Sequence, residues 1–255
     1  MRLIDLSVPI LNQPHCEVDQ AKPQINYFDH IASVPGMLEM FPGSGVNDLP
    51  GGKAWAYEMV TLQTHSGTHL DAPYHYGPFM DDGMPTMKIG DINLEWCFSD
   101  AVMLDFSQRP PEIVLTAKDY QDELDRIGYK LRESDIVLVQ TGAAKYWGTE
   151  KYLHEGVGTG REATLWLIEQ GVHLVGTDAW SWDRPLSLTA KEFQHSKDSS
   201  IIWEGHFAGL KKPYCHIEKL ANLDQLPHFG FQVACFPIHV QEASAGWVRA
   251  VAILP

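Results

Sequence analysis

The chain has few cysteines, and no two of them are closely spaced. Cys16, Cys97, Cys215 and Cys235 are the four cysteines in 255 residues, and none belongs to a CxxC pair. This scarcity argues against a disulfide framework and against a thiolate zinc knuckle. Buried free thiols are the expected state of these residues.

Positive charge is also scarce. The chain has 19 lysines and arginines against 33 aspartates and glutamates, a net charge of -14, and the basic residues are scattered. A nucleic-acid surface is therefore excluded. No apolar run approaches the roughly 20 residues that span a membrane, and residues 1–6 lack the apolar core of a signal peptide. We expect a cytoplasmic enzyme without a nucleic-acid or membrane partner.

An apolar content of 44% over 255 residues is enough for a sizeable core. Repeats and low-complexity linkers are absent, so the sequence predicts one domain over residues 1–255. A polar, proline-bearing stretch runs from residue 11 through Gly52 without clear periodicity. We expect it to form a long loop and a wall of the binding pocket.

Strands and helices alternate in the remainder of the chain, which predicts an α/β architecture. Two helices have start and stop signals: Thr116 with Asp119 before a stop at Gly128, and Thr159 with Glu162 before a stop at Gly171. The last two strands could pair antiparallel and make the sheet mixed. The expected strands cover residues 3–10, 101–106, 136–140, 172–177, 231–238 and 248–254.

The segment from His65 to His75 concentrates residues that bind metals. His65, His69, Asp71 and His75 all occupy odd positions, so an extended chain projects them from one face. Imidazoles and a carboxylate are the donors that zinc, manganese or iron accept. A strand whose histidines are only surface groups is the alternative, but four converging donors favour a functional site.

A fully extended path across these residues would cover about 33 Å, so one ion cannot take both end histidines unless the segment bends. Gly67 and Pro73 could allow that bend. The economical division makes His65, His69 and Asp71 the ligands of an ion and leaves His75 beside it as an acid or base. Orienting the site without proton transfer is the alternative role for His75.

The segment matches HxGTHxDxPxH, and the chain thereby resembles the cyclase family of metal-dependent hydrolases, which includes bacterial kynurenine formamidases and isatin hydrolases. Further resemblance lies at residues 6–10, 176–178, 218–223 and 249–254. It implies a single α/β domain of the swivelling β/β/α type with a mixed sheet, and a homodimer or higher homo-oligomer.

The resemblance also implies a second ion, to which Asp71 bridges. His206 and Glu218 are the matching candidates for its remaining ligands, because they have the family's separation. Since this chain keeps Glu218, we expect two ions, zinc or manganese, rather than the single ion of the isatin branch. Such ions lower the pKa of bound water and polarise a carbonyl group.

The expected activity is hydrolysis of a C–N amide bond in a small aromatic substrate, with N-formylkynurenine-type formamides of tryptophan catabolism as the leading class. A lactam or lactone ring-opening hydrolase is the nearest alternative. A non-catalytic metal-binding domain is the alternative from another class.

Aromatic residues near these motifs suggest a flat substrate, although each could instead belong to the core. Asp178, at the end of an expected strand, is predicted to organise hydrogen bonds rather than to bind a metal. The candidate substrate-binding residues are Tyr76, Phe79, Trp180 and Trp182.

Overall fold

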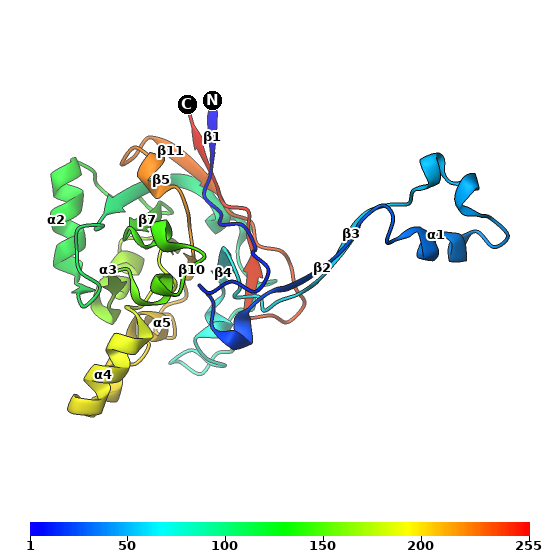
Figure 1. The fold of residues 1–255 in the computed structure, drawn as a ribbon. Helices are drawn as coiled ribbons and strands as arrows, with labels where there is room; N and C mark the ends of the chain where they lie inside the picture. The colour runs from blue at the N-terminus through cyan, green and yellow to red at the C-terminus, as the bar shows by residue number, and fades with distance from the viewer.

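A nine-stranded mixed sheet forms the centre of the computed structural model, which describes residues 1–255 (Figure 1). Its strand order is β1-β13-β11-β5-β7-β9-β10-β4-β12. In chain order these strands are β1 (Arg2–Asp5), β4 (His69–Asp71), β5 (Phe98–Asp105), β7 (Ile136–Gln140), β9 (Leu174–Thr177), β10 (Cys215–Glu218), β11 (Phe231–Ala234), β12 (Ala245–Trp247) and β13 (Val251–Leu254).

Besides short 3₁₀ helices, the remaining elements are two strand pairs and five α-helices. The pairs are β2 (Gln24–Phe28) with β3 (Tyr57–Thr61), and β6 (Val114–Leu115) with β8 (Gly158–Thr159). The helices are α1 (Val34–Met40), α2 (Ala117–Ile127), α3 (Arg161–Glu169), α4 (Leu186–Ser196) and α5 (Glu204–Ala208).

The middle of the sheet is parallel and its flanks are antiparallel. β5, β7, β9 and β10 run parallel to one another, whereas β11 pairs antiparallel with both β5 and β13. The predicted α/β class with a mixed sheet is therefore confirmed, as is the antiparallel pairing of the last two expected strands. No helix is long and apolar enough to cross a membrane.

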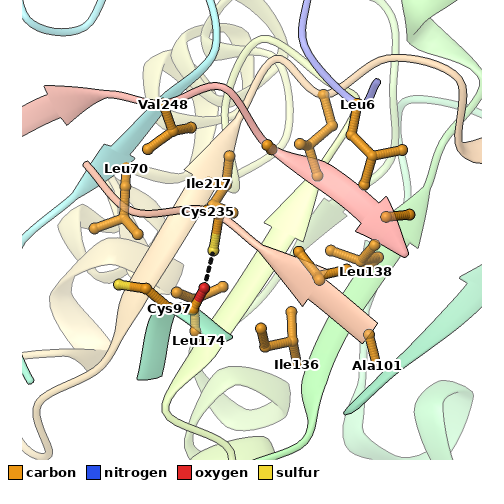
Figure 2. Close-up of a cluster of buried hydrophobic side chains, with 14 of the residues drawn as sticks. Leu6, Leu70, Cys97, Ala101, Ile136, Leu138, Leu174, Ile217, Cys235 and Val248 are labelled. Carbon is orange, nitrogen blue, oxygen red and sulfur yellow. Dashed lines mark hydrogen bonds between the residues drawn. The ribbon is translucent and has the colours of Figure 1, made fainter. Parts of the chain in front are cut away.

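Alternate residues of the central strands enter two different cores. Ala101 and Met103 of β5 pack with β7, β10 and β11 in the cluster that Figure 2 shows. Val102 and Leu104 face the other side, where α2 and α3 cover the sheet. This division follows from the two-residue period of a strand. All four cysteines are buried and free, as predicted.

Helix α2 begins and ends where its sequence signals predict. The Thr116 hydroxyl accepts a hydrogen bond from the Asp119 N–H, and the Asp119 carboxylate accepts one from the Thr116 N–H. These reciprocal bonds satisfy backbone donors that the first helical turn leaves free. Gly128 ends the helix with a φ of 68°.

The predicted cap of the next helix was wrong. Gly160, not Thr159, precedes α3, and no side chain caps that helix. Thr159 instead belongs to β8, and its hydroxyl lies 2.6 Å from the Tyr120 hydroxyl. The Glu162 carboxylate accepts a hydrogen bond from the Ala117 N–H at the start of α2. Long-range pairing of β8 with β6 therefore overrides the local capping pattern.

Residues 24–61 project from the body as an arm, which Figure 1 shows extending well beyond the sheet. β2 and β3 pair only with each other, and α1 lies toward the tip. We expected a long loop here, and the two-stranded ribbon was not predicted. A small cluster around Val34, Leu49 and Ala54 is the arm's only apolar core.

Candidate metal centre

The segment from His65 to His75 bends at the two predicted places. Gly67 has a φ of 67°, a left-handed conformation that glycine adopts readily. Only His69–Asp71 is a strand, and a 3₁₀ turn follows from Pro73 to His75. The bends bring the His65 and His75 rings to 4.1 Å between centroids.

The pairing of β4 with β10 places two further donors opposite the motif. In this antiparallel register His216 lies across from Asp71, and Glu218 lies across from His69. Leu70 between them points to the opposite face, into the apolar core of Figure 2. Strand alternation therefore separates polar donors from the core.

Two donor groups share the Asp71 carboxylate. In the first donor group, defined as His65, His69 and Asp71, Asp71 Oδ1 lies 2.9 Å from His65 Nδ1 and 3.3 Å from His69 Nε2. The second donor group comprises Asp71, His206, His216 and Glu218, whose donor atoms all lie within 4.8 Å of one another.

Distances inside the second donor group resemble those around a common ion. His216 Nε2 lies 3.0 Å from Asp71 Oδ2 and 3.3 Å from Glu218 Oε1. His206 Nε2 lies 3.6 Å from the same Glu218 oxygen. Ligand atoms that hold one zinc tetrahedrally at about 2.0–2.2 Å are about 3.3–3.6 Å from one another.

Hydrogen bonds orient the two histidines of the second donor group. His206 Nδ1 lies 2.5 Å from Asp183 Oδ2, which leaves Nε2 facing Glu218. His216 Nδ1 lies 3.1 Å from the hydroxyls of both Tyr76 and Tyr214. Such bonds to the remote ring nitrogen fix the ring and leave the other nitrogen free for a metal.

Two buried ligand atoms of the cluster, His69 Nε2 and Asp71 Oδ1, lie 3.3 Å apart, and neither makes a hydrogen bond of acceptable geometry. Buried polar atoms without partners are costly in folded proteins, and a bound cation would satisfy both at once. The residues present therefore fit a divalent cation, and the nitrogen and carboxylate donors suit zinc or manganese.

Charges in the cluster shift the pKa values of its side chains strongly. Burial raises the pKa of the Asp71 carboxyl, but the neighbouring histidines outweigh burial and hold this pKa well below its ordinary value. Burial alone would lower the pKa of His216, whereas its bonds to Asp71 and Glu218 raise it to about 9. The ring can therefore carry a proton that a metal would displace.

His75 differs from the other imidazoles of the cluster. Burial lowers the pKa of His75 to about 3, so the ring is neutral near pH 7. Its Nε2 lies 3.8 Å from Asp71 Oδ2, beyond hydrogen-bond distance. A neutral ring at this position offers a lone pair to a proton donor in the cavity.

A cavity of about 200 Å³ opens onto the donor groups, and its wall includes His65, His75, His206 and Glu218. Apolar and aromatic walls come from Val18, Leu186, Trp180 and Trp203. Four larger surface hollows, of about 440, 390, 300 and 280 Å³, lie elsewhere and have no histidine in their walls.

The four predicted substrate-binding aromatics occupy different places. Trp180 lines the cavity. Tyr76 is buried with its hydroxyl on His216, and Trp182 is buried with its indole N–H donating to Thr164. Phe79 is 58% exposed, and neither it nor the two buried residues line the cavity.

Asp178 organises a turn, as predicted. Its carboxylate accepts hydrogen bonds from the Thr141 N–H, the Thr141 hydroxyl and the Gly142 N–H, at 2.6, 2.6 and 3.0 Å. Glu17, Val18 and Ala21, from the stretch that we expected to form a pocket wall, line the cavity.

Sequence reasoning missed His216. The signal was present in Cys215-His216-Ile217-Glu218, where two polar residues alternate with two apolar ones. That alternation places His216 on the same strand face as Glu218. Asp183 was missed as well, because nothing local shows that it meets a histidine 23 residues later.

The fold and this site define a class: a mixed α/β protein with a buried cluster of histidines and carboxylates that could hold a divalent cation, beneath a partly aromatic cavity. The chain belongs to the Putative cyclase family, whose model matches residues 4–184. The resemblance seen in the sequence is thereby confirmed. His206, His216 and Glu218 lie beyond the matched residues.

Curated relatives and solved structures agree with this membership. The chain is 27% identical over 192 residues to a kynurenine formamidase of Erythrobacter litoralis, covering 75% of this chain and 74% of the relative. It is 24% identical over 237 residues to an isatin hydrolase of Roseibium aggregatum, covering 80% and 77%. The prediction of an enzyme of the amidohydrolase class is confirmed.

An isatin hydrolase bound to the product analogue thioisatinate has a similar fold, with a TM-score of 0.74 at 20% identity. The alignment covers 99% of this chain and 92% of that structure.

Proposed function

We propose that residues 1–255 form one catalytic domain that hydrolyses a C–N amide bond in a small aromatic substrate, with N-formylkynurenine-type formamides as the leading class. The carrying observation is the pair of buried, unpartnered donor atoms, His69 Nε2 and Asp71 Oδ1, beneath a cavity that His75 lines. The formamidase relative, aligned over 75% of this chain, supports the substrate class.

Two divalent ions, zinc or manganese, are proposed, one for each donor group. Bound there, they supply Lewis acidity and a more acidic water molecule. His65, His69 and Asp71 would hold the first ion, and His206, His216 and Glu218 would hold the second together with Asp71. Asp71 Oδ1 faces the first donor group and Asp71 Oδ2 faces the second, which supports a carboxylate shared by the two ions.

His75 moves the proton in the proposed reaction. Its neutral ring accepts a proton as the oxygen of water bonds to the substrate carbonyl carbon. The protonated ring then returns that proton to the leaving nitrogen as the C–N bond breaks. Trp180 and Trp203 would flank a flat ring in the cavity.

A lactam or lactone ring-opening hydrolase is the second candidate. The isatin hydrolase relative, which aligns over 80% of this chain, favours it. A non-catalytic metal-binding domain has one supporting observation, the four protein donors of the second donor group, because structural sites have complete ligand sets. Both donor groups border the cavity, through His65 of the first and through His206 and Glu218 of the second, which supports catalysis instead.

The test combines metal analysis with hydrolysis of formamides, lactams and lactones by the same preparation. We expect two metals per chain and fastest turnover of an aryl formamide. Turnover of isatin or a lactone without formamide turnover would replace the leading candidate by the second. Bound metal without any turnover would favour the non-catalytic alternative.

We also propose that the arm, residues 24–61, packs against a second copy of the chain in a homodimer. An isolated two-stranded ribbon is only marginally stable in water. All five residues of β3 are exposed, so nothing in the chain itself covers this strand. Tyr27 and Met59 are 65% and 60% exposed, and Met40 and Phe41 near the tip are exposed too. Apolar surface of this extent is typical of interaction sites.

Light scattering on the full chain tests the dimer. The wild type is expected at twice the mass of one chain, and the variant Tyr27→Lys/Met59→Lys at the mass of one. A wild type that is monomeric at micromolar concentration would refute the proposal.

A further inference from the structure

Glu17 and Lys219 form an ion pair inside the protein, beside the donor groups but not part of them. Lys219 Nζ lies 2.7 Å from each oxygen of the Glu17 carboxylate. Only 3% of the lysine side chain and 1% of the glutamate side chain are exposed. Because burying two charges offsets most of their attraction, stability alone is a weak reason for such a pair.

Both partners are bound to the loop between the first two histidines of the motif. Lys219 Nζ donates a hydrogen bond to the His65 carbonyl oxygen at 2.8 Å. The Gly67 N–H donates to Glu17 Oε1 at 3.1 Å, and the Thr68 hydroxyl donates to the Lys219 carbonyl at 2.6 Å. Three bonds therefore fasten residues 65–68 to the pair.

Lys219 directly follows Glu218, so the same bonds tie the loop to the end of β10. Lys219 has a φ of 61°, in the left-handed region that residues with side chains seldom adopt. Strain of this kind persists only where the surrounding structure fixes it, and it is frequent at functional sites. The bonds of Lys219 provide that constraint.

The pair also holds a cavity wall. The Trp180 indole N–H donates to Glu17 Oε2 at 3.2 Å, and Lys219 Nζ lies 5.2 Å from the centre of the Trp180 ring. The three N–H donors of the Lys219 ammonium face three acceptors: both Glu17 oxygens and the His65 carbonyl. No donor is left to bind a substrate anion.

We infer that Glu17 and Lys219 are positioning residues: their ion pair sets the separation between the loop of the first donor group and Glu218, and it fixes Trp180 against the substrate. Both residues border the cavity, but their charged groups are bonded to each other and to protein groups. The inference rests on the proposed metal-dependent function.

The experiment compares zinc affinity, thermal stability and steady-state kinetics of the full-length variants Lys219→Met and Glu17→Gln/Lys219→Met. The single variant leaves Glu17 as an unpaired buried charge, so it should lose stability. The double variant removes both charges and should recover most of the melting temperature. The dissociation constant of the most tightly bound zinc ion should nevertheless rise about 10-fold to 100-fold, the usual effect of losing a group that orients a metal ligand.

In the kinetics we expect kcat of the double variant to fall more than KM rises, since the reacting groups are misplaced while the cavity remains. The matched control is Glu123→Gln/Arg126→Met, which removes an ion pair of 2.7 Å on α2, away from the cavity. This control should leave zinc affinity and kcat unchanged.

A double variant that binds zinc within threefold of the wild type and turns over at the wild-type rate would overturn the inference and leave the proposed function intact. A wild type without tight zinc binding would overturn both. If the double variant does not fold, Thr68→Val decides, because it removes one of the three fastening bonds without burying a charge. Unchanged zinc affinity in Thr68→Val would then overturn the inference.

Discussion

The substitution His216→Gln should separate the two donor groups. His216 contributes one of four donors to the second donor group, and its Nε2 faces both Asp71 and Glu218 at 3.0–3.3 Å. Glutamine keeps a polar side chain that can hydrogen bond to these carboxylates but is a poor zinc ligand. We expect the variant to fold, to keep the first ion and to bind the second weakly.

The size of the effect follows from the number of donors. Structural zinc sites with four donors bind their ion with about 10–16 kcal/mol, so one donor accounts for about 2.5–4 kcal/mol. A free-energy loss of this size raises the dissociation constant about 100-fold to 1,000-fold. Both proteins should be measured at pH 9. His216 is then about half deprotonated in the metal-free wild type, so competition between zinc and the proton contributes little to the difference in affinity.

The assay is competition with a chromophoric chelator, read for two successive zinc ions. His195→Ala is the control, since His195 lies on the exposed end of α4 and contacts only the Lys191 carbonyl. A second-ion affinity within threefold of the wild type in His216→Gln would refute His216 as a ligand. Loss of both ions would instead mean that His216 supports the whole cluster.

Three further predictions concern titration, catalysis and folding. Zinc affinity of the second donor group should rise up to about tenfold per pH unit between pH 7 and 9, because binding expels the proton that His216 holds with a raised pKa of about 9; a flat profile in the wild type would contradict this. His75→Ala should lower kcat about 10²-fold to 10⁴-fold at unchanged metal content, and a full rate would exclude proton transfer by His75. Thr116→Ala should cost about 1 kcal/mol of unfolding free energy in urea through the lost cap of α2, with Lys118→Ala as the neutral control.

Local signals in the sequence predicted the parts of the fold that local chemistry determines. The reciprocal bonds of Thr116 and Asp119 need only neighbouring residues, so α2 and its stop at Gly128 could be read directly. The bends at Gly67 and Pro73 followed from the length of the segment and the conformational limits of those residues. The first donor group could be predicted from the sequence because its three residues lie close together in the chain.

Features that depend on distant pairing were out of reach. Thr159 looked like a helix cap, but a two-residue ladder with β6 places it in a strand. His216 faces Asp71 only because β10 pairs with β4, residues 145 positions apart. The arm escaped prediction because its strands have exposed residues and no one-sided apolar alternation. The cytoplasmic location stays a prediction.

The position of β4 in the sheet has a consequence for the order in which the protein matures. β4 lies between β10 and β12, two strands from the last fifth of the chain. A growing chain leaves the ribosome from its N-terminus, so His65, His69 and Asp71 emerge long before the strands that flank them. The motif therefore waits for about 150 residues of further synthesis before Glu218 can join it. Completion of the second donor group is thus a late event in folding, because it needs the C-terminal strand β10 beside β4.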